Sequence, residues 1–264
     1  MRHQAVVFWR KRKQAHPLHI KSAGAQRRTI IPPDPSQTGY AICTSPRSGS
    51  NFLCQVLAST DELGNPLEYF NAPGRRQLGL PDYPDNIDEQ IQWILTKSIT
   101  PNRIYALKLF AYQHDMISQQ VSWTQALPNL QFVFLTRRDL LAQAISWAMA
   151  IQTEQYRWSQ PRKSEPHYDA ALISRCLHDI AKEQARWQMF FARNDIHPAT
   201  LVYEDFADRP QVAVECVSNL LRMTNVPDIN STRVDIKVQR NAVNLEWRRR
   251  FVAQEGDRDY IDPL

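Results

Sequence analysis

Residues 40–60, YAICTSPRSGSNFLCQVLAST, decide the fold class. The first five form an apolar run that is typical of a buried strand, and Asn51–Thr60 carries apolar side chains at helical spacing. Ser45–Ser50 joins the two directly. Small residues there let successive backbone N–H groups turn inward, and the helix N-terminus adds donors and the positive end of a dipole. The stretch predicts a strand–loop–helix unit that binds a phosphate, phosphosulfate or sulfate group.

The side chains of this loop narrow the chemistry further. Ser48 and Ser50 supply hydroxyls, and Arg47 supplies a cation. An ordinary strand–helix turn, in which Ser50 or Asn51 caps the helix, is the alternative interpretation. The loop departs from the P-loop motif of nucleotide triphosphatases, because no lysine follows Gly49. We therefore expect a nucleotide whose transferred group needs no metal, and we predict no metal site.

The alternation of strand and helix continues along the chain. Apolar runs predict strands at 40–44, 104–110, 130–136 and 200–203. Four such alternations favour an α/β, P-loop-like three-layer fold, with a central, mostly parallel sheet of four to five strands and helices on both faces. In such sheets ligands bind beyond the carboxyl ends of the strands. Helices are expected at 51–60, 88–97, 116–127, 139–156, 169–194 and 208–223, and loops at 71–86 and 157–166.

A second candidate anion site follows the strand at 130–136. Arg137 stands at the strand end, and Ser146 lies about two helical turns into the next helix. A guanidinium and a hydroxyl placed this way can grip a phosphate together. The alternative is an arginine at a helix start that pairs with an acidic residue. Two anion loops at neighbouring strand ends suit a ligand with two separated phosphates.

The charge of the chain is unevenly distributed. The formal net charge is +5, from 32 Lys and Arg against 27 Asp and Glu. Residues 1–33 hold eight of the basic residues and no acidic one, so the remainder has 24 basic against 27 acidic residues. We predict a basic N-terminal extension at 1–38 and one catalytic domain at 39–264. Contact of the extension with an anionic partner or surface is the alternative.

Cysteine usage and hydropathy indicate the compartment. The four cysteines form no CxxC pair, which favours buried thiols in a reducing environment. No apolar run reaches the length of a membrane span, and the apolar patch Ala5–Trp9 is shorter than the core of a signal peptide. We expect a cytoplasmic protein with no transmembrane span.

At this point the motifs resemble a known family. PRSGS at 46–50 followed by LGNPLEYF at 63–70 is similar to the bacterial trehalose-type (glycolipid) sulfotransferases, which use 3′-phosphoadenosine 5′-phosphosulfate (PAPS). The order and spacing of several further segments agree over roughly residues 38–252. These segments are Leu107–Leu109, Arg137–Trp147, Tyr203–Phe206 and Gln239–Trp247. The sequence departs from the family pattern at Arg138, Arg240, Asn241 and Asn244.

The resemblance implies a role for each matching residue. Glu68 would be the general base, and Arg47 and Lys108 would stabilise charge on the leaving phosphate. Lys108 lies in an apolar strand, so a snorkelling lysine is the equal alternative. Residues 239–247 would close over the nucleotide. The 5′-phosphosulfate would be held by Arg47, Ser48, Gly49, Ser50 and Asn51, and the 3′-phosphate by Arg137 and Ser146.

The resemblance also implies an acceptor hydroxyl of a carbohydrate or glycolipid, no nucleic-acid partner and a possible homodimer. Residues 71–100 and 156–168 would choose the acceptor. Their aromatic rings suit a sugar, although packing is as good an explanation for Trp93 and Trp158. Two alternatives remain: a P-loop nucleotide kinase or phosphotransferase, and a non-catalytic binder of anions or nucleic acid through the basic extension. The candidate acceptor residues are Arg75, Arg76, Trp93, Arg157, Trp158 and His167.

Overall fold

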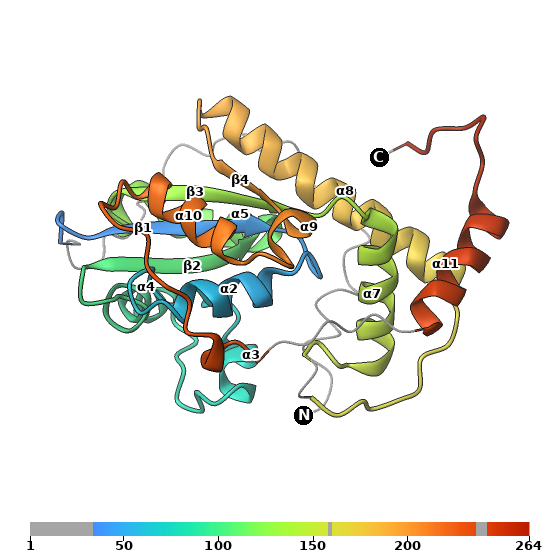
Figure 1. The fold of residues 1–264 in the computed structure, drawn as a ribbon, viewed down its shortest axis with the longest axis horizontal. Helices are drawn as coiled ribbons and strands as arrows, with labels where there is room; N and C mark the ends of the chain where they lie inside the picture. Colours follow the sequence, from blue (N-terminus) through green and yellow to red (C-terminus); the bar gives the residue numbers. More distant parts are fainter. Residues whose placement is uncertain (1–33, 158–159, 236–241, 264) are drawn as a thin grey trace.

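The computed structural model describes residues 34–157, 160–235 and 242–263, so the basic stretch at 1–33 lies outside it. Within these ranges four strands form one sheet in the order β2-β1-β3-β4, and all neighbours run parallel (Figure 1). The predicted α/β fold with a parallel sheet is confirmed, with four strands. They are β1 (Thr38–Thr44), β2 (Ile104–Phe110), β3 (Leu130–Thr136) and β4 (Ala199–Val202).

Helices cover both faces of the sheet. One face packs against α4 (Ile87–Lys97), α5 (Ala111–Ser118) and α8 (Ala170–Arg193). The other packs against α2 (Ser50–Ala58), α9 (Tyr203–Phe206) and α10 (Gln211–Leu220). A third cluster joins α7 (Leu140–Thr153) and α11 (Ala242–Glu255) to α8, to one side of the sheet (Figure 1).

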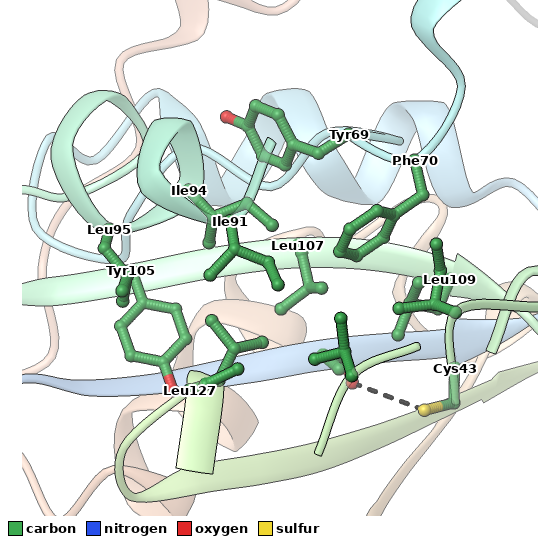
Figure 2. Packing of buried hydrophobic residues seen from close by; sticks show 14 of the residues in the cluster. Cys43, Tyr69, Phe70, Ile91, Ile94, Leu95, Tyr105, Leu107, Leu109 and Leu127 are labelled. Carbon is green, nitrogen blue, oxygen red and sulfur yellow. Dashed lines mark hydrogen bonds between the residues drawn. The ribbon is translucent and has the colours of Figure 1, made fainter. Parts of the chain in front are cut away.

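The central strand β1 shows why the sheet is apolar on both sides. Ala41 and Cys43 point into the cluster that Figure 2 draws, whereas Tyr40 and Ile42 point into the opposite one. Successive side chains of a strand alternate between faces, so a strand covered on both sides is apolar throughout. Thr44, at its end, is fully buried, and the loop that joins β1 to α2 follows it. The four cysteines are free thiols, three of them buried, as the sequence predicts.

Two predicted elements between β1 and β3 are wrong. The stretch at 116–127 is not one helix, because α5 begins directly after β2, where Gln113 accepts a hydrogen bond from the backbone N–H of Phe110. A separate short helix, α6 (Trp123–Ala126), follows. The stretch at 71–86 is not all loop, because Asn71 caps α3 (Ala72–Gln77) by accepting from Gly74 N–H.

The remaining boundaries are close to those predicted. Asp139 and Asp169 each cap the helix that follows, through a hydrogen bond to the third backbone N–H. The sequence did not predict α9, α11 or the short 3₁₀ turn Ser231–Arg233. In the part of the chain that the structure describes, no helix combines the length and the apolar character that crossing a bilayer would require.

Candidate functional site

Hydrogen bonds with β3, α7 and α8 fix the loop after β1 in place. The Thr44 hydroxyl donates to the carbonyl of Leu135 at 2.9 Å and shares a hydrogen bond with Ser48 Oγ at 2.7 Å. Trp187 Nε1 donates to the Thr44 carbonyl at 3.1 Å. Gln143 Nε2, from α7, donates to Ser45 Oγ at 2.9 Å and to the Pro46 carbonyl at 2.6 Å. These contacts hold the loop in one shape before any ligand arrives.

The backbone of the loop presents its N–H groups at the start of α2. Arg47 and Gly49 have positive φ values of 61° and 90°, so the chain alternates in handedness there, as in an anion nest. Gly49 also packs so tightly on Tyr203 that a Cβ would lie 2.1 Å from a ring carbon. No side chain caps α2, and Ser48 and Ser50 are buried beside its first turn. Uncapped N–H donors and the helix dipole make this the natural place for a phosphate or sulfate group.

Arg47 connects this loop to the second predicted anion site. Its Nε donates to Ser146 Oγ at 3.0 Å, and its NH1 donates to the Tyr156 carbonyl at 2.7 Å. Both Arg47 and Ser146 line a small pocket beside α7 that Asn244 of α11 also reaches. Burial, followed by the nearby charge of Arg137, lowers the pKa of Arg47. The structure thus brings together residues that the sequence assigned to separate phosphates.

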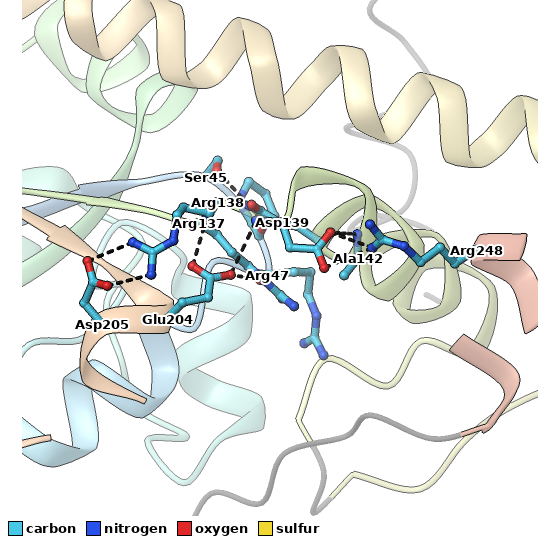
Figure 3. Close-up of polar contacts among 11 residues, drawn as sticks. Ser45, Arg47, Arg137, Arg138, Asp139, Ala142, Glu204, Asp205 and Arg248 are labelled. Carbon is cyan, nitrogen blue, oxygen red and sulfur yellow. Dashed lines mark hydrogen bonds and ion pairs between the residues drawn. The ribbon is translucent and has the colours of Figure 1, made fainter. Parts of the chain in front are cut away.

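Arg137 follows the last residue of β3, as predicted, and its side chain packs against α9 (Figure 3). Its Nε lies 3.5 Å from Glu204 Oε1, and its guanidinium stacks 5.2 Å from the centre of the Tyr203 ring. Its NH1 donates to the Arg47 carbonyl at 3.4 Å. Arg137 therefore faces the same edge of the sheet as the first loop. It lies among a carboxylate, an aromatic ring and the backbone of that loop.

Two ion pairs next to the end of β3 hold the neighbouring helices in place and are not assigned to the candidate site. Arg138, one departure from the family pattern, is exposed and forms a two-pronged pair with Asp205 at 2.6 and 3.0 Å. Arg248 of α11 pairs with Asp139, the cap of α7, at 2.8 and 3.0 Å (Figure 3). Burial works to raise the pKa of Asp139, but hydrogen bonds from Arg248 and from a backbone N–H outweigh it and leave the pKa lowered.

Glu68 and Lys108 form the second half of the site. Lys108 Nζ lies 3.4 Å from Glu68 Oε2 and donates to Asn51 Oδ1 at 2.9 Å. Glu68 Oε1 accepts from Gln113 Nε2 at 2.9 Å and from Asn71 Nδ2 at 3.2 Å. The side chains of Lys108 and Glu68 are only 6% and 13% exposed. Lys108 is thus a buried cation of the site, so the alternative of a snorkelling lysine is wrong.

The backbone beside Glu68 explains its fixed position. Leu67 makes an isolated parallel bridge with Leu107, and its carbonyl accepts from Lys108 N–H at 2.9 Å. Asn71, which binds Glu68, also caps α3. The carboxylate is therefore attached to the sheet on one side and to a helix on the other, and is not a solvated loop group.

Several residues that hold the site were not predicted. Gln143 lies within the matching segment Arg137–Trp147 but was given no role, and Gln113 lies in the first turn of α5, which begins before the predicted helix at 116–127. Among the proposed acceptor residues, Trp93 packs on Tyr83 at 5.1 Å within the core, so packing explains it. Trp158 lies outside the described residues.

The proposed nucleotide-closing stretch is described only in part. Residues 239–241 lie outside the described ranges. Asn244 Nδ2 contacts Met149 Sδ at 3.2 Å, and Trp247 is buried against Tyr168 at 6.0 Å. The described residues of this stretch therefore pack α11 onto α7 and α8, and Asn244 reaches the pocket beside Arg47.

Comparison with known proteins gives three results. Residues 39–254 match the protein-family model described as Stf0 sulphotransferase. Among solved structures, the chain is similar to the sulfotransferase domain of the olefin synthase from Synechococcus PCC 7002. The identity is 16%, 90% of this chain and 100% of that chain are covered, and the TM-score is 0.41. No curated protein matches the chain.

Proposed function

Because this chain belongs to the Stf0 sulphotransferase family, we propose that it moves the sulfuryl group of PAPS to a hydroxyl of a carbohydrate or glycolipid. The observation that carries the proposal is the contact of Glu68 with Lys108, which in turn binds Asn51 at the start of α2. A carboxylate and a cation thereby stand next to the anion-binding loop. Family membership supports PAPS as the donor, and the resemblance of the motifs supports the acceptor class.

The donor would lie along the edge where β1 and β3 end. The uncapped start of α2 suits its 5′-phosphosulfate, with Ser48, Gly49, Ser50 and Asn51 around it. Arg137 and Ser146 suit its 3′-phosphate. Arg47 belongs to the loop before α2 and donates a hydrogen bond to Ser146, so it is placed to bind either phosphate. The two phosphates would thus be bound by neighbouring strand ends.

The chemistry needs a base on the acceptor side and a cation on the leaving side. When bound, PAPS supplies the sulfuryl group and leaves as adenosine 3′,5′-bisphosphate. The acceptor oxygen forms a bond to sulfur, the bond from sulfur to the phosphate oxygen breaks, and that oxygen keeps the electron pair. Glu68 takes the hydroxyl proton, a step typically worth about 10²–10⁴-fold in rate. Lys108 and Arg47 stabilise the negative charge that grows on the phosphate.

A thermal-shift experiment tests the donor. Adenosine 3′,5′-bisphosphate should raise the Tm of the chain, because a ligand that binds only the folded state stabilises it. ATP with magnesium should not. The reverse result would favour a nucleotide kinase and overturn the proposal. Transfer of label from PAPS to sugars, glycolipids and small alcohols then identifies the acceptor class.

The Glu68→Gln variant tests the base. It keeps the shape of the side chain but cannot take a proton, so kcat should fall by about 10²–10⁴-fold while the affinity for adenosine 3′,5′-bisphosphate stays near that of the wild type. Glu215→Gln, at an exposed position of α10, is the matched control. An unchanged kcat in Glu68→Gln would remove Glu68 from the mechanism.

We propose in addition that residues 1–38 are an extension of the domain at 39–264, although its last residues are attached to that domain, since Asp34 pairs with Arg103 and β1 begins at Thr38. Deletion of 1–33 should then leave transfer intact. We also propose that the chain is a homodimer, which sedimentation velocity tests directly.

A further inference from the structure

Arg75, in α3, is a buried cation with no counter-ion in the described part of the chain. The residue is 4% exposed, and its Nε has no hydrogen-bond partner. Its neighbour Arg76 shows the ordinary arrangement, a pair with Asp85 at 2.9 Å. A guanidinium nitrogen that is buried without a hydrogen-bond partner is unfavourable, because the group carries a positive charge. Such a group is expected where a ligand supplies the missing negative charge.

Arg75 lies one helical turn from the residue that holds the base. Its backbone N–H donates to the Asn71 carbonyl at 2.9 Å, and the Asn71 side chain donates to Glu68. Its carbonyl accepts from two backbone N–H groups, those of Leu78 and Leu80, which fixes the end of α3. The position of Arg75 relative to Glu68 is therefore set by a rigid, hydrogen-bonded segment.

Arg157, in the loop after α7, lies within electrostatic reach of Arg75 and of Glu68. Its guanidinium forms no hydrogen bond or ion pair with the described residues, and only its backbone is tied, to Gln160. Burial lowers the pKa of Arg157, the charge of Arg75 lowers it further, and the charge of Glu68 acts in the opposite direction. The buried cation Arg75 and the half-buried Arg157 therefore influence each other's charge, and Glu68 is within electrostatic reach of Arg157.

Arg75 lies on the side of Glu68 that faces away from the groups assigned to the donor. The donor groups, by contrast, are met by the loop at 45–51 and by Arg47, Arg137 and Ser146. In Figure 1, α3 lies beyond α2 as seen from β3 and β4. Glu68 binds Lys108 toward the donor and Asn71 toward α3. An anion held by Arg75 would thus belong to the molecule that presents its hydroxyl to Glu68.

Resting on the proposed function, we propose that the acceptor carries an anionic group, a carboxylate, phosphate or sulfate, close to the hydroxyl that is modified, and that Arg75 and Arg157 bind it. Two guanidinium groups suit such a group, because each can donate two parallel hydrogen bonds to it. A neutral acceptor leaves both cations without compensation. The pair therefore selects acidic sugars or acidic glycolipids over their neutral counterparts.

The test compares matched acceptors and matched variants. Transfer from labelled PAPS is measured with a glucuronide and the corresponding glucoside, and with a sugar phosphate and the free sugar. The wild type should prefer the anionic member of each pair by about 10- to 100-fold in kcat/KM, the range expected for a hydrogen bond to a charged group. Arg75→Met and Arg157→Met should lose that preference through KM, and Arg193→Gln, at an exposed position in the last turn of α8, should keep it. Equal rates on both members in the wild type, or a preference that survives both substitutions, would overturn the proposal.

Two further measurements separate this proposal from the proposed function. Arg75→Met should bind adenosine 3′,5′-bisphosphate as the wild type does, and its Tm without ligand should be unchanged or higher, because an unpaired buried charge has been removed. With that nucleotide saturating, added sulfate should stabilise the wild type further but not Arg75→Met. Absence of this second stabilisation in the wild type would refute the anion site. Failure of the nucleotide to bind would instead refute the assignment of the donor.

Discussion

The contact between Gly49 and Tyr203 yields a prediction whose size follows from the structure. In Gly49→Ala the new Cβ would lie 2.1 Å from one carbon of the Tyr203 ring and 2.6 Å from another. The φ of +90° adds a backbone cost of about 1–2 kcal/mol, and overpacking adds about 1–3 kcal/mol. We therefore expect the free energy of unfolding to fall by about 2–5 kcal/mol in total.

Two further variants separate these contributions. Gly79 has a φ of +99° but nothing within 4 Å of its Cβ position, so Gly79→Ala should show the backbone cost alone. In Gly49→Ala/Tyr203→Ala the ring is gone, and the double-mutant cycle should return a coupling energy of about 1–3 kcal/mol. Urea unfolding monitored by circular dichroism gives the free energies of the four proteins of the cycle, Tyr203→Ala included, and of Gly79→Ala. The reasoning is refuted if Gly49→Ala costs no more than Gly79→Ala, or if the cycle shows no coupling.

Three other predictions concern the polar groups His114, Asp139 and Thr44. Burial, and secondarily the charge of Arg186, lowers the pKa of His114 to about 4. Between about pH 6.5 and 4 the unfolded chain therefore binds a proton at this imidazole that the folded chain does not bind, and the free energy of unfolding falls as the pH drops through this range. His114→Phe should reduce that loss by about 3 kcal/mol in urea titrations across this range. Burial works to raise the pKa of Asp139, but hydrogen bonds outweigh it and leave the pKa lowered. The ionised carboxylate therefore stabilises the fold above the pKa of the unfolded carboxyl, about 3.9, and this stabilisation is lost as the pH falls through the lower pKa of the folded state. In Asp139→Asn the free energy of unfolding should depend less on pH in this acidic range. Thr44→Val removes the partner of the Ser48 hydroxyl and should cost about 1–3 kcal/mol in chemical denaturation, whereas an unchanged midpoint would show that the Ser48 hydroxyl finds another partner.

The parts of the fold that the sequence predicted are those with strong local signals. The run at 130–136 is apolar because β3 is covered on both faces, and Asp139 and Asp169 mark the helices that they cap. The helix at 116–127 was wrong because apolar spacing alone cannot show that Gln113 reaches back to bond Phe110 N–H. α3 was missed because its Pro73 and Gly74 are typical of loops, although proline is well suited to a first helical turn.

In the candidate site, too, the sequence predicted the residues that follow local patterns and missed the contacts between distant segments. The strand ends placed Arg47 and Arg137 at one edge, since parallel strands end together. The pairing of Glu68 with Lys108 joins residues 40 positions apart and depends on the bridge between Leu67 and Leu107, which no local pattern reveals. Arg75 was only one of several candidate acceptor residues, because its lack of a counter-ion is a property of the packed chain.

The bridge at Leu67 has a consequence for handling the protein. β2 is an edge strand, yet all seven of its residues are buried. The segment that carries Glu68 covers part of this edge, where Leu67 accepts from Lys108 N–H. An uncovered apolar edge strand is a template for pairing between molecules and for aggregation. Substitutions in residues 66–70 can therefore lower the soluble yield as well as the rate, so any inactive variant there should be checked by light scattering before its loss of activity is assigned to chemistry.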